Sequence, residues 1–317
     1  MSATPLVRAA ASPVTGAIVL LDGRELPPSE QVISIFDRGF LFGDAVFEVL
    51  RTYEGVPFAH VEHLQRLASS CALLGLDAPI DHLPSELFTA VRRCRAEGAA
   101  DCYVRLVITR GEGPLHLDPT PCRTPRRLVI ASPLLPLPAS LASGVAMATV
   151  RAHRAADGTE ASAAKVTAYV GNLLAYVEAR RRGAYEALLI ADTGEVLEGH
   201  SSSFFVVRGG RVETPPASMG ILPGITRAMI ARAAARLALP FVERVLVPSD
   251  LHRADEAFLT SSLREVVPVV RIDGVPVGAG APGPVTLALT AAYREVVRSA
   301  VRAAEDAASR VAGTGSG

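Results

Sequence analysis

Changes in the spacing of the hydrophobic positions predict the order of helices along the chain. Apolar residues three and four positions apart indicate a helix that buries one side. One such run predicts a helix over 60–75 that Gly75 ends, and it consists of Leu64, Leu67, Cys71 and Leu74. Further helices are expected over 84–97, 168–182, 225–238 and 284–302. In the helix over 168–182, the expected buried side consists of Val170, Leu173, Leu174 and Val177.

Shorter apolar runs, bounded by glycine, proline and aspartate, predict strands between these helices. The predicted strands and hairpins cover 16–26, 45–58, 102–110, 126–134, 144–150, 187–199, 203–215, 241–247, 256–262 and 266–277. Hairpins and helices occur in clusters and do not alternate strictly. The pattern therefore favours an α+β fold over a doubly wound parallel sheet.

The length of 317 residues suggests about two domains. Two prolines in the stretch LLPLPAS favour a linker between them, at 134–142. We accordingly expect a small α/β domain over 14–133 and a larger domain over 143–302. Residues 1–13 are expected to form a disordered tail and residues 303–317 a flexible one, because both are rich in small residues.

Composition excludes several classes of function. The chain carries 32 basic and 32 acidic residues without a basic stripe, so nucleic acid and anionic membranes are not expected partners. It has no apolar run of about 18 residues and no apolar core of a signal peptide near its start. The four cysteines form no CxxC pair, which favours reduced thiols in the cytoplasm.

Two weak motifs are set aside. His60 and His63 are spaced for one face of a helix but lack a third ligand, so no metal site is expected. The glycines of 278–283 match GxGxxG, but they follow a hairpin, include a proline and lack an acidic partner further on. This segment is therefore expected to be a loop.

The lysine content is unusual. The 32 basic residues are 31 arginines and a single lysine, Lys165. Arginine replaces lysine readily on a surface but not where a deprotonatable primary amine is required. A codon bias explains the general depletion, and the one lysine that remains is a candidate for a chemical role.

Three polar segments are candidates for binding an anion or a heterocycle. Thr226 follows Pro223-Gly224 at the start of a predicted helix, where free backbone N–H groups bind phosphate. Glu198 begins a polar link between two strands, and a carboxylate there could protonate a ring nitrogen. Thr260-Ser261-Ser262 ends an apolar strand. Taken singly, the first two segments are better explained as a capped helix and a solvated loop, and the third is equally well explained as a polar strand end.

Taken together, the motifs closely resemble the class IV, fold type IV aminotransferases that depend on pyridoxal 5′-phosphate (PLP). This family includes branched-chain aminotransferases, D-amino-acid aminotransferases and aminodeoxychorismate lyases. The resemblance covers about residues 16–300. It rests on the order and spacing of Asp37-Arg38-Gly39, Phe47-Glu48, 62–67, Lys165–Asn172, Glu198-Gly199, Leu222–Arg227 and Ala254–Thr260.

The resemblance implies a two-domain α+β fold, with a small α/β domain and a larger β-barrel-like domain with helices. It implies that Lys165 binds PLP as a Schiff base and moves a proton, that Glu198 faces the pyridine nitrogen, and that Tyr169 lies near the phenolic oxygen. The implied phosphate-binding residues are Arg66, Ile225, Thr226 and Ser262. The implied substrate-binding residues are Phe47, Val49, Tyr103, Arg105, Ser261 and Leu263. A homodimer is implied as well.

The resemblance leaves the reaction open between members of the family. A transaminase would exchange an amino group between a branched-chain or D-amino acid and a 2-oxo acid such as 2-oxoglutarate. Tyr103 and Arg105 look like the branched-chain type, whereas Val49 and the serine-rich EGHSSSFF lean toward the D-amino-acid type. Ser262-Leu263 looks like the alternative, a lyase that releases pyruvate and 4-aminobenzoate from aminodeoxychorismate. A third reading is a PLP-binding protein without catalytic activity. All the positions that carry the chemistry are filled, which argues against this reading.

Two residues depart from the family pattern. Ser203 stands where an asparagine is common, which concerns the geometry of its loop. Arg264 stands where the branched-chain type usually has a small residue. Either it adds a second cation to the substrate pocket or it points to solvent, and we expect solvent.

Overall fold

The computed structural model describes residues 15–27, 30, 33–152 and 163–314, so the predicted tail over 1–13 lies outside the described residues. The described chain forms two compact units. Unit 1 runs to Leu135 and also includes Lys165–Thr167, and unit 2 contains the rest, from Pro136 onward. The change of unit falls within the stretch 134–142 that the sequence suggested as a linker. Residues 165–167 were expected in the second domain, and the structure instead places them in unit 1.

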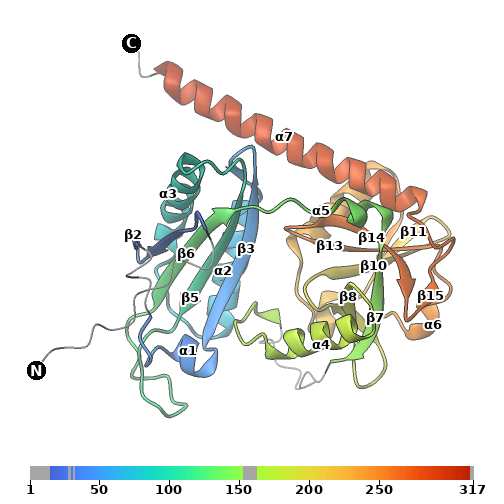
Figure 1. Ribbon diagram of the computed structural model, residues 1–317, viewed down its shortest axis with the longest axis horizontal. Coiled ribbons are helices and arrows are strands. Elements are labelled where there is room, and N and C mark those ends of the chain that lie inside the picture. The colour runs from blue at the N-terminus through green and yellow to red at the C-terminus, as the bar shows by residue number, and fades with distance from the viewer. Residues whose placement is uncertain (1–14, 28–29, 31–32, 153–162, 315–317) are drawn as a thin grey trace, which may run out of the picture. The chain divides into compact units, whose positions relative to one another are not determined.

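Unit 1 is an antiparallel sheet with helices on one face (Figure 1). The strand order is β2-β1-β6-β5-β3-β4. The strands are β1 (Ile18–Leu21), β2 (Arg24–Glu25), β3 (Ala45–Tyr53), β4 (Val56–Pro57), β5 (Cys102–Thr109) and β6 (Arg126–Pro133), and the helices are α1 (Arg38–Phe42), α2 (His60–Leu73), the 3-10 turn Ile80–His82 and α3 (Leu83–Ala96).

The core of unit 1 lies between this sheet and α2 and α3. Alternate residues of β3 and β5, such as Leu50 and Leu106, meet Leu67 of α2 and Leu87 of α3 there. The helical periodicity seen in the sequence is therefore the side of α2 that packs on the sheet. The remaining alternate residues of β3 and β5 face the other side of the sheet, away from the helices.

Unit 2 is built on a mixed nine-stranded sheet of order β12-β11-β10-β13-β14-β7-β8-β9, with β15 beside β14. The parallel pairs are β14 with β7, β7 with β8, and β11 with β12. The strands are β7 (Val145–Arg151), β8 (Glu186–Ile190), β9 (Val196–Gly199), β10 (Ser203–Arg208), β11 (Arg211–Thr214), β12 (Phe241–Glu243), β13 (Glu256–Ser261), β14 (Glu265–Ile272) and β15 (Val275–Pro276), and the helices are α4 (Val170–Arg181), α5 (Ile225–Arg236), α6 (Pro248–Leu251), α7 (Pro284–Thr314) and the 3-10 turns Ala139–Ser143 and Ala217–Met219.

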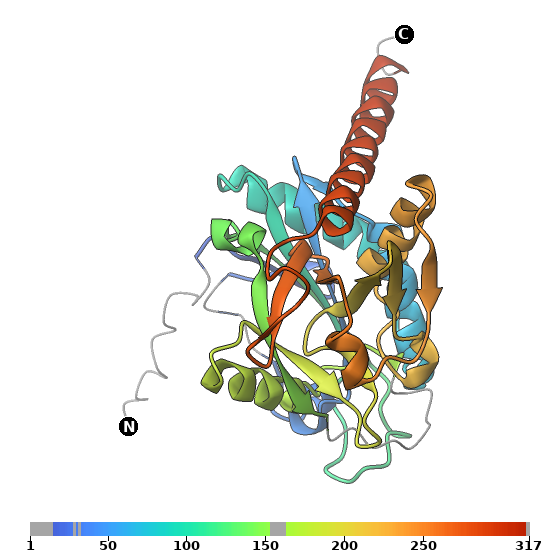
Figure 2. The same ribbon diagram turned by 90° about the vertical axis from the view of Figure 1, so that its right-hand side faces the viewer.

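The buried side of α4 differs from the prediction. Val170, Leu173 and Leu174 are 67%, 56% and 63% exposed. The residues that α4 buries are Ala175 and Ala179, which lie in one apolar cluster with small and aliphatic residues of β7 and β8. Figure 2 shows α4 beside these strands. Alanine lets a helix approach a sheet closely, and here it takes the place that the larger apolar residues were expected to fill.

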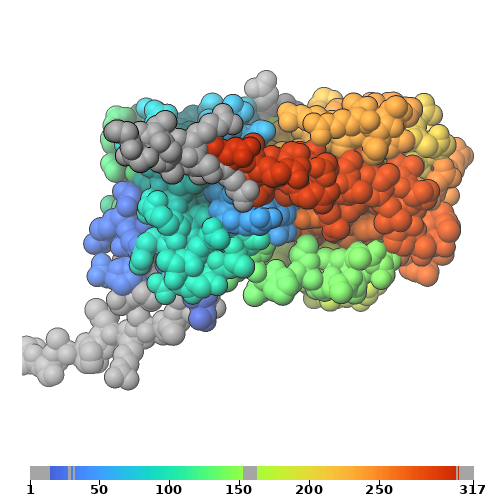
Figure 3. Space-filling view, turned by 90° about the horizontal axis from the view of Figure 1, so that it is seen from above, coloured from blue at the N-terminus to red at the C-terminus, as the bar shows by residue number. Residues whose placement is uncertain are grey.

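The last helix is longer than expected. It was predicted to end at 302 and to be followed by a flexible tail, but α7 continues to Thr314. The composition that suggested a tail is rich in alanine, which has the highest helix propensity. Glu256 of β13 accepts hydrogen bonds from the backbone N–H groups of Val285 and Thr286, at 2.9 and 2.7 Å, and so caps the start of α7. Figure 3 shows α7, in red, on the surface of unit 2.

The segment 278–283, before α7, contains no helix or strand, as expected for the discounted GxGxxG match. Across the residues that the structure describes, no helix combines the length and the apolar character that crossing a membrane requires. In the same described part of the chain, no group of three or more histidines, cysteines or acidic residues is arranged to hold a metal ion.

Candidate active site

Lys165 is held by its backbone in unit 1. Its carbonyl oxygen accepts a hydrogen bond from the N–H of Phe47, at 2.9 Å, and its own N–H donates to Ser70 Oγ, at 3.1 Å. Two residues on, the N–H of Thr167 donates to the carbonyl oxygen of Ala45, at 2.9 Å. The segment that carries the only lysine is therefore added to the edge of β3, and it is pinned to α2 through the buried Ser70.

The side chain of Lys165 lies over an aromatic ring. Its Nζ is 4.6 Å from the centre of the Phe47 ring, and the guanidinium of Arg105 lies 4.1 Å from the same centre. Cations are attracted to the face of an aromatic ring. Three residues that the sequence pointed to, Lys165, Phe47 and Arg105, are thus brought together within unit 1.

The predicted substrate residues of unit 1 share one face of the sheet. Val49 pairs with Arg105 across β3 and β5, and two residues along, Arg51 pairs with Tyr103. Because side chains alternate along a strand, Phe47, Val49, Tyr103 and Arg105 all project from the face opposite to α2 and α3. The face thus combines the apolar side chains of Phe47 and Val49 with two guanidinium groups, that of Arg105 over Phe47 and that of Arg51 over Tyr53.

Arg66 is held by a buried carboxylate on the other face. Glu48 of β3 is fully buried and accepts from Arg66 Nε at 2.6 Å, from Arg66 Nη2 at 2.8 Å, and shares a hydrogen bond with His63 Nδ1 at 2.7 Å. Burial opposes the ionisation of Glu48, but the hydrogen bonds and charges of Arg66 and His63 outweigh it and hold the pKa at about 2. Burial lowers the pKa of His63. Glu48 is therefore an anion that orients Arg66.

Sequence reasoning gave Glu48 no role, although a signal was present. An acidic residue inside the apolar strand AVFEVL, with histidine and arginine three residues apart on the following helix, indicates a buried ion pair. His63, which had been weighed as a metal ligand, belongs to this pair.

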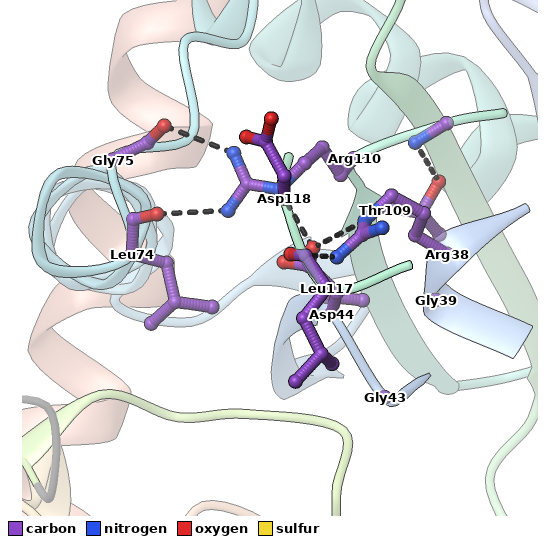
Figure 4. Close-up of polar contacts among 12 residues, drawn as sticks. Arg38, Gly39, Gly43, Asp44, Leu74, Gly75, Thr109, Arg110, Leu117 and Asp118 are labelled. Atoms are coloured by element: carbon purple, nitrogen blue, oxygen red, sulfur yellow. Dashed lines mark hydrogen bonds and ion pairs between the residues drawn. The ribbon is translucent and has the colours of Figure 1, made fainter. Parts of the chain in front are cut away.

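A second, partly buried ion cluster fixes the loop after β5 (Figure 4). Asp44 accepts from Arg38 at 3.0 Å and from Arg110 at 2.7 Å. Arg38 also donates to the carbonyl oxygens of Pro114, His116 and Leu117. The Asp37-Arg38-Gly39 motif thus positions the loop that follows the predicted substrate strand.

In unit 2, Glu198 lies buried at the end of β9. Its Oε2 accepts a hydrogen bond from the backbone N–H of Leu222, at 3.3 Å, which holds it beside the turn leading into α5. Ile225 and Thr226 form the buried first turn of that helix. The backbone N–H groups of a first helical turn lack partners within the helix, and they attract anions.

The small side chain of Ser203 leaves space for the turn that leads into α5. A Cβ on Gly224, the residue before α5, would lie 2.5 Å from Ser203 Oγ, so glycine and a small side chain meet there. Ser203 also pairs with Thr260 across β10 and β13, two residues before Ser262. The small Ser203 therefore packs between the strand end that carries Ser261-Ser262 and the start of α5.

The turn after Glu198 is held from α4. Tyr169 Oη and Asn172 Nδ2 both donate to the backbone carbonyl oxygen of His200, at 3.2 and 2.5 Å. The Tyr169 hydroxyl, expected from the resemblance near a cofactor oxygen, thus contacts the loop next to Glu198. Burial lowers the pKa of His200.

Arg264 does not point to solvent. Its side chain is 14% exposed and forms an ion pair with the buried Glu186 of β8. Its charge is neutralised by that carboxylate, which also argues against a second cation in the substrate pocket. The expectation failed because Glu186 lies 78 positions earlier in the chain, where no local pattern connects it with Arg264.

Comparisons with known proteins agree with this arrangement. Residues 45–272 match the family model described as amino-transferase class IV. A putative branched-chain-amino-acid aminotransferase of Methanocaldococcus jannaschii is 36% identical over 279 residues, or 88% of this chain and 96% of the relative. D-alanine aminotransferase of Bacillus licheniformis is 34% identical over 286 residues, or 89% and 97%. The crystal structure of the T.th. branched-chain amino acid aminotransferase with pyridoxamine 5′-phosphate has a TM-score of 0.81 at 32% identity, and the match covers 90% of this chain and 95% of that one.

Proposed function

Because the chain belongs to the class IV aminotransferases, we propose that it transfers an amino group between an amino acid and a 2-oxo acid such as 2-oxoglutarate, with PLP bound to Lys165. The fold type IV architecture and the family that the motifs resembled are confirmed. The relatives of this chain include aminotransferases of the branched-chain and D-alanine types. Class IV aminotransferases use PLP. For the substrate, we propose a branched-chain amino acid or a D-amino acid.

The residues of this chain suit PLP by their chemistry. The start of α5, with Thr226 and the backbone of Ile225, provides donors for a phosphate, and Ser262 and the oriented Arg66 add a hydroxyl and a cation. Glu198 is a buried carboxylate, the type of group that accepts a hydrogen bond from a protonated ring nitrogen. When bound, PLP withdraws electrons from the bonds at the amino acid's α-carbon.

The protein's own groups perform the remaining tasks. Lys165 Nζ would move a proton between the amino acid's α-carbon and the cofactor carbon, as a primary amine can and a guanidinium cannot. Arg105 binds the α-carboxylate, because its planar fork matches two oxygens. We propose that Phe47 and Val49 contact the side chain of the substrate, and that Tyr103, Ser261 and Leu263 are further substrate-binding residues.

The single observation that carries the proposal is the placement of Lys165. The one lysine among 317 residues is held by hydrogen bonds of its backbone N–H and carbonyl oxygen, and its amine lies over the Phe47 ring beside Arg105. Reduction of the PLP-treated protein with borohydride should therefore attach the cofactor to a single side chain. Peptide mass spectrometry is expected to find the label on Lys165. A label confined to the N-terminal amine, or near-normal turnover in folded Lys165→Ala, would refute the proposal.

The substrate is tested by a half-reaction screen. L- and D-amino acids are added singly to the PLP-treated enzyme, and the visible absorbance of lysine-bound cofactor is followed. An apolar L-amino acid is expected to bleach it if the pocket is of the branched-chain type, and D-alanine if it is of the D-amino-acid type. Lack of any keto acid from either class would refute the transaminase.

The lyase remains the alternative because Ser262-Leu263 follows the pattern of that subgroup. The same Lys165 and Glu198 would serve, since electron withdrawal also weakens a bond at the β-position. Release of pyruvate from aminodeoxychorismate without an amino acceptor would favour the lyase, and dependence on an acceptor would favour the transaminase.

We also propose a homodimer in the cytoplasm. The exposed apolar residues of α4, Val170, Leu173 and Leu174, suit a surface that a second copy covers. The four cysteines are all free thiols, as is usual in a reducing compartment.

A further inference from the structure

Glu186 is the centre of a buried polar cluster in unit 2. The residue is fully buried, and its carboxylate accepts from Arg264 Nη1, from Ser202 Oγ at 2.7 Å and from the backbone N–H of Ser201 at 3.2 Å. Such a carboxylate is tolerated in a protein interior because its lone pairs are satisfied and its charge is paired. Arg264 supplies the permanent counter-charge of the cluster, and His200 Nδ1 lies 3.5 Å from the same carboxylate.

Arg264 joins two turns to this carboxylate. Its Nε donates to Ser261 Oγ at 3.0 Å, at the end of β13 where the turn that carries Ser262 begins. Its Nη2 donates to the carbonyl oxygen and the Oγ of Ser201, at 3.1 and 3.0 Å, in the turn between β9 and β10. A guanidinium has five N–H donors in a fixed plane, so one side chain can hold both turns in a defined geometry.

Each of these turns adjoins a residue proposed to bind PLP. Glu198 directly precedes the turn Gly199–Ser202, and Ser262 lies between Ser261 and Arg264. The turn is packed tightly against Glu186, because a Cβ on Gly199 would lie 2.6 Å from Glu186 Oε1. Because Glu198 is joined to this turn by the chain, the course of the turn sets the direction in which its carboxylate projects.

We propose that Arg264 is a positioning residue that acts through Glu186: it fixes the turn Gly199–Ser202, and with it the Glu198 carboxylate, relative to the turn that carries Ser262. The inference rests on the proposed function. Neither Arg264 nor Glu186 touches the cofactor in this scheme. Their buried ion pair holds both Glu198, proposed at the ring nitrogen, and Ser262, proposed at the phosphate.

The test compares Arg264→Leu with a matched control elsewhere in unit 2. Arg244 pairs with the buried Glu213 at 2.6 Å and with Asp250 at 2.9 Å, so Arg244→Leu likewise removes an arginine from a buried carboxylate in unit 2, although Glu213 keeps Arg211 at 3.1 Å. The readouts are the equilibrium dissociation constant of PLP from the apoprotein, the pH titration of the visible absorbance of lysine-bound cofactor, and the melting temperature.

Both variants should melt at lower temperature than the wild type. Arg264→Leu is expected to weaken PLP binding by about 10- to 100-fold, the range found when the residues that orient the ligands of a metal ion are removed. It should also shift the pH titration of the absorbance. Arg244→Leu should leave the dissociation constant within about twofold and the titration unchanged. Arg264→Lys, which retains the charge but not the planar fork, should restore part of the affinity.

Equal effects of the two leucine variants on PLP binding and on the titration would overturn the inference, because they would show a role in stability alone. If Arg264→Leu does not fold, Arg264→Lys and Arg244→Lys provide the same comparison, with a smaller difference expected between them. A wild type that binds no PLP at Lys165 would instead overturn the proposed function. The two failures are therefore distinguishable.

Discussion

Glu48 holds Arg66 through two hydrogen bonds, at 2.6 and 2.8 Å, from the core side of the sheet in unit 1. On the opposite face of the same strand, the amine of Lys165 and the guanidinium of Arg105 lie over the ring of Phe47. Adjacent residues of one strand thus serve two sets of cations. The alternation of a strand keeps the sets on opposite faces.

Glu48→Gln should weaken PLP binding. The neutral amide cannot orient Arg66 as a carboxylate does, so we expect about a tenfold rise in the dissociation constant. The control is Glu25→Gln, which breaks the exposed pair with Arg93 in the same unit and should change stability by no more than about 0.5 kcal/mol. Unchanged PLP affinity in folded Glu48→Gln would contradict the role of this pair.

The stability of unit 1 should depend on acid through Glu48. Its pKa is lowered from 4.5 to about 2, so its contribution is present above pH 4.5 and is lost as the pH falls toward 2. The difference corresponds to about 3 kcal/mol as an order of magnitude. The lowered pKa of His63 acts in the same direction, because as the pH falls the ring of the unfolded chain takes up a proton before the buried ring does. Denaturant titrations from pH 7 to pH 3 should show a shallower loss of stability in Glu48→Gln than in the wild type.

Two glycines in unit 2 should respond oppositely to alanine. In Gly199→Ala the new Cβ would meet Ser202 Oγ at 2.1 Å and Glu186 Oε1 at 2.6 Å, so we expect a loss of about 2 kcal/mol or more. Gly171, in α4, has nothing within 4 Å of the added Cβ, and alanine there should stabilise by about 0.5–1 kcal/mol. Urea unfolding of both variants measures the difference. Equal stability of the two would show that the turn after Glu198 yields to the added atom.

The exposed apolar side of α4 should matter for assembly. Leu174 is 63% exposed in the single chain, and Leu174→Arg should shift sedimentation from dimer to monomer, because a charge desolvated in an interface is costly. Leu237→Arg, at an exposed leucine just after α5, is the control and should leave the dimer intact. A wild-type monomer with full activity would refute the proposed dimer.

Much of the local structure follows from the sequence. The helix expected over 60–75 is α2 at His60–Leu73, and the one expected over 225–238 is α5 at Ile225–Arg236. Both patterns are strong because one side of each helix packs on a core and a chain-breaking or loop segment follows. The pattern on α4 misled because its exposed residues are apolar while its packed residues are alanines.

The candidate chemistry also begins in the sequence. Only one residue supplies a side-chain primary amine, so composition alone could select Lys165, and the order of the motifs identified the family. These conclusions need residue identity and spacing, which a sequence contains in full.

The tertiary structure decided which charges meet. Glu48 pairs with Arg66 across 18 positions, and Glu186 pairs with Arg264 across 78. It also attached Lys165 to unit 1, although the lysine follows the crossing into unit 2 along the chain. Strand alternation and helix period are local and visible in a sequence. The pairing of buried charges is decided by which strands and helices pack together. A charge inside an apolar strand, such as Glu48, indicates that a partner exists, but for Glu186 no local pattern identifies Arg264 as that partner.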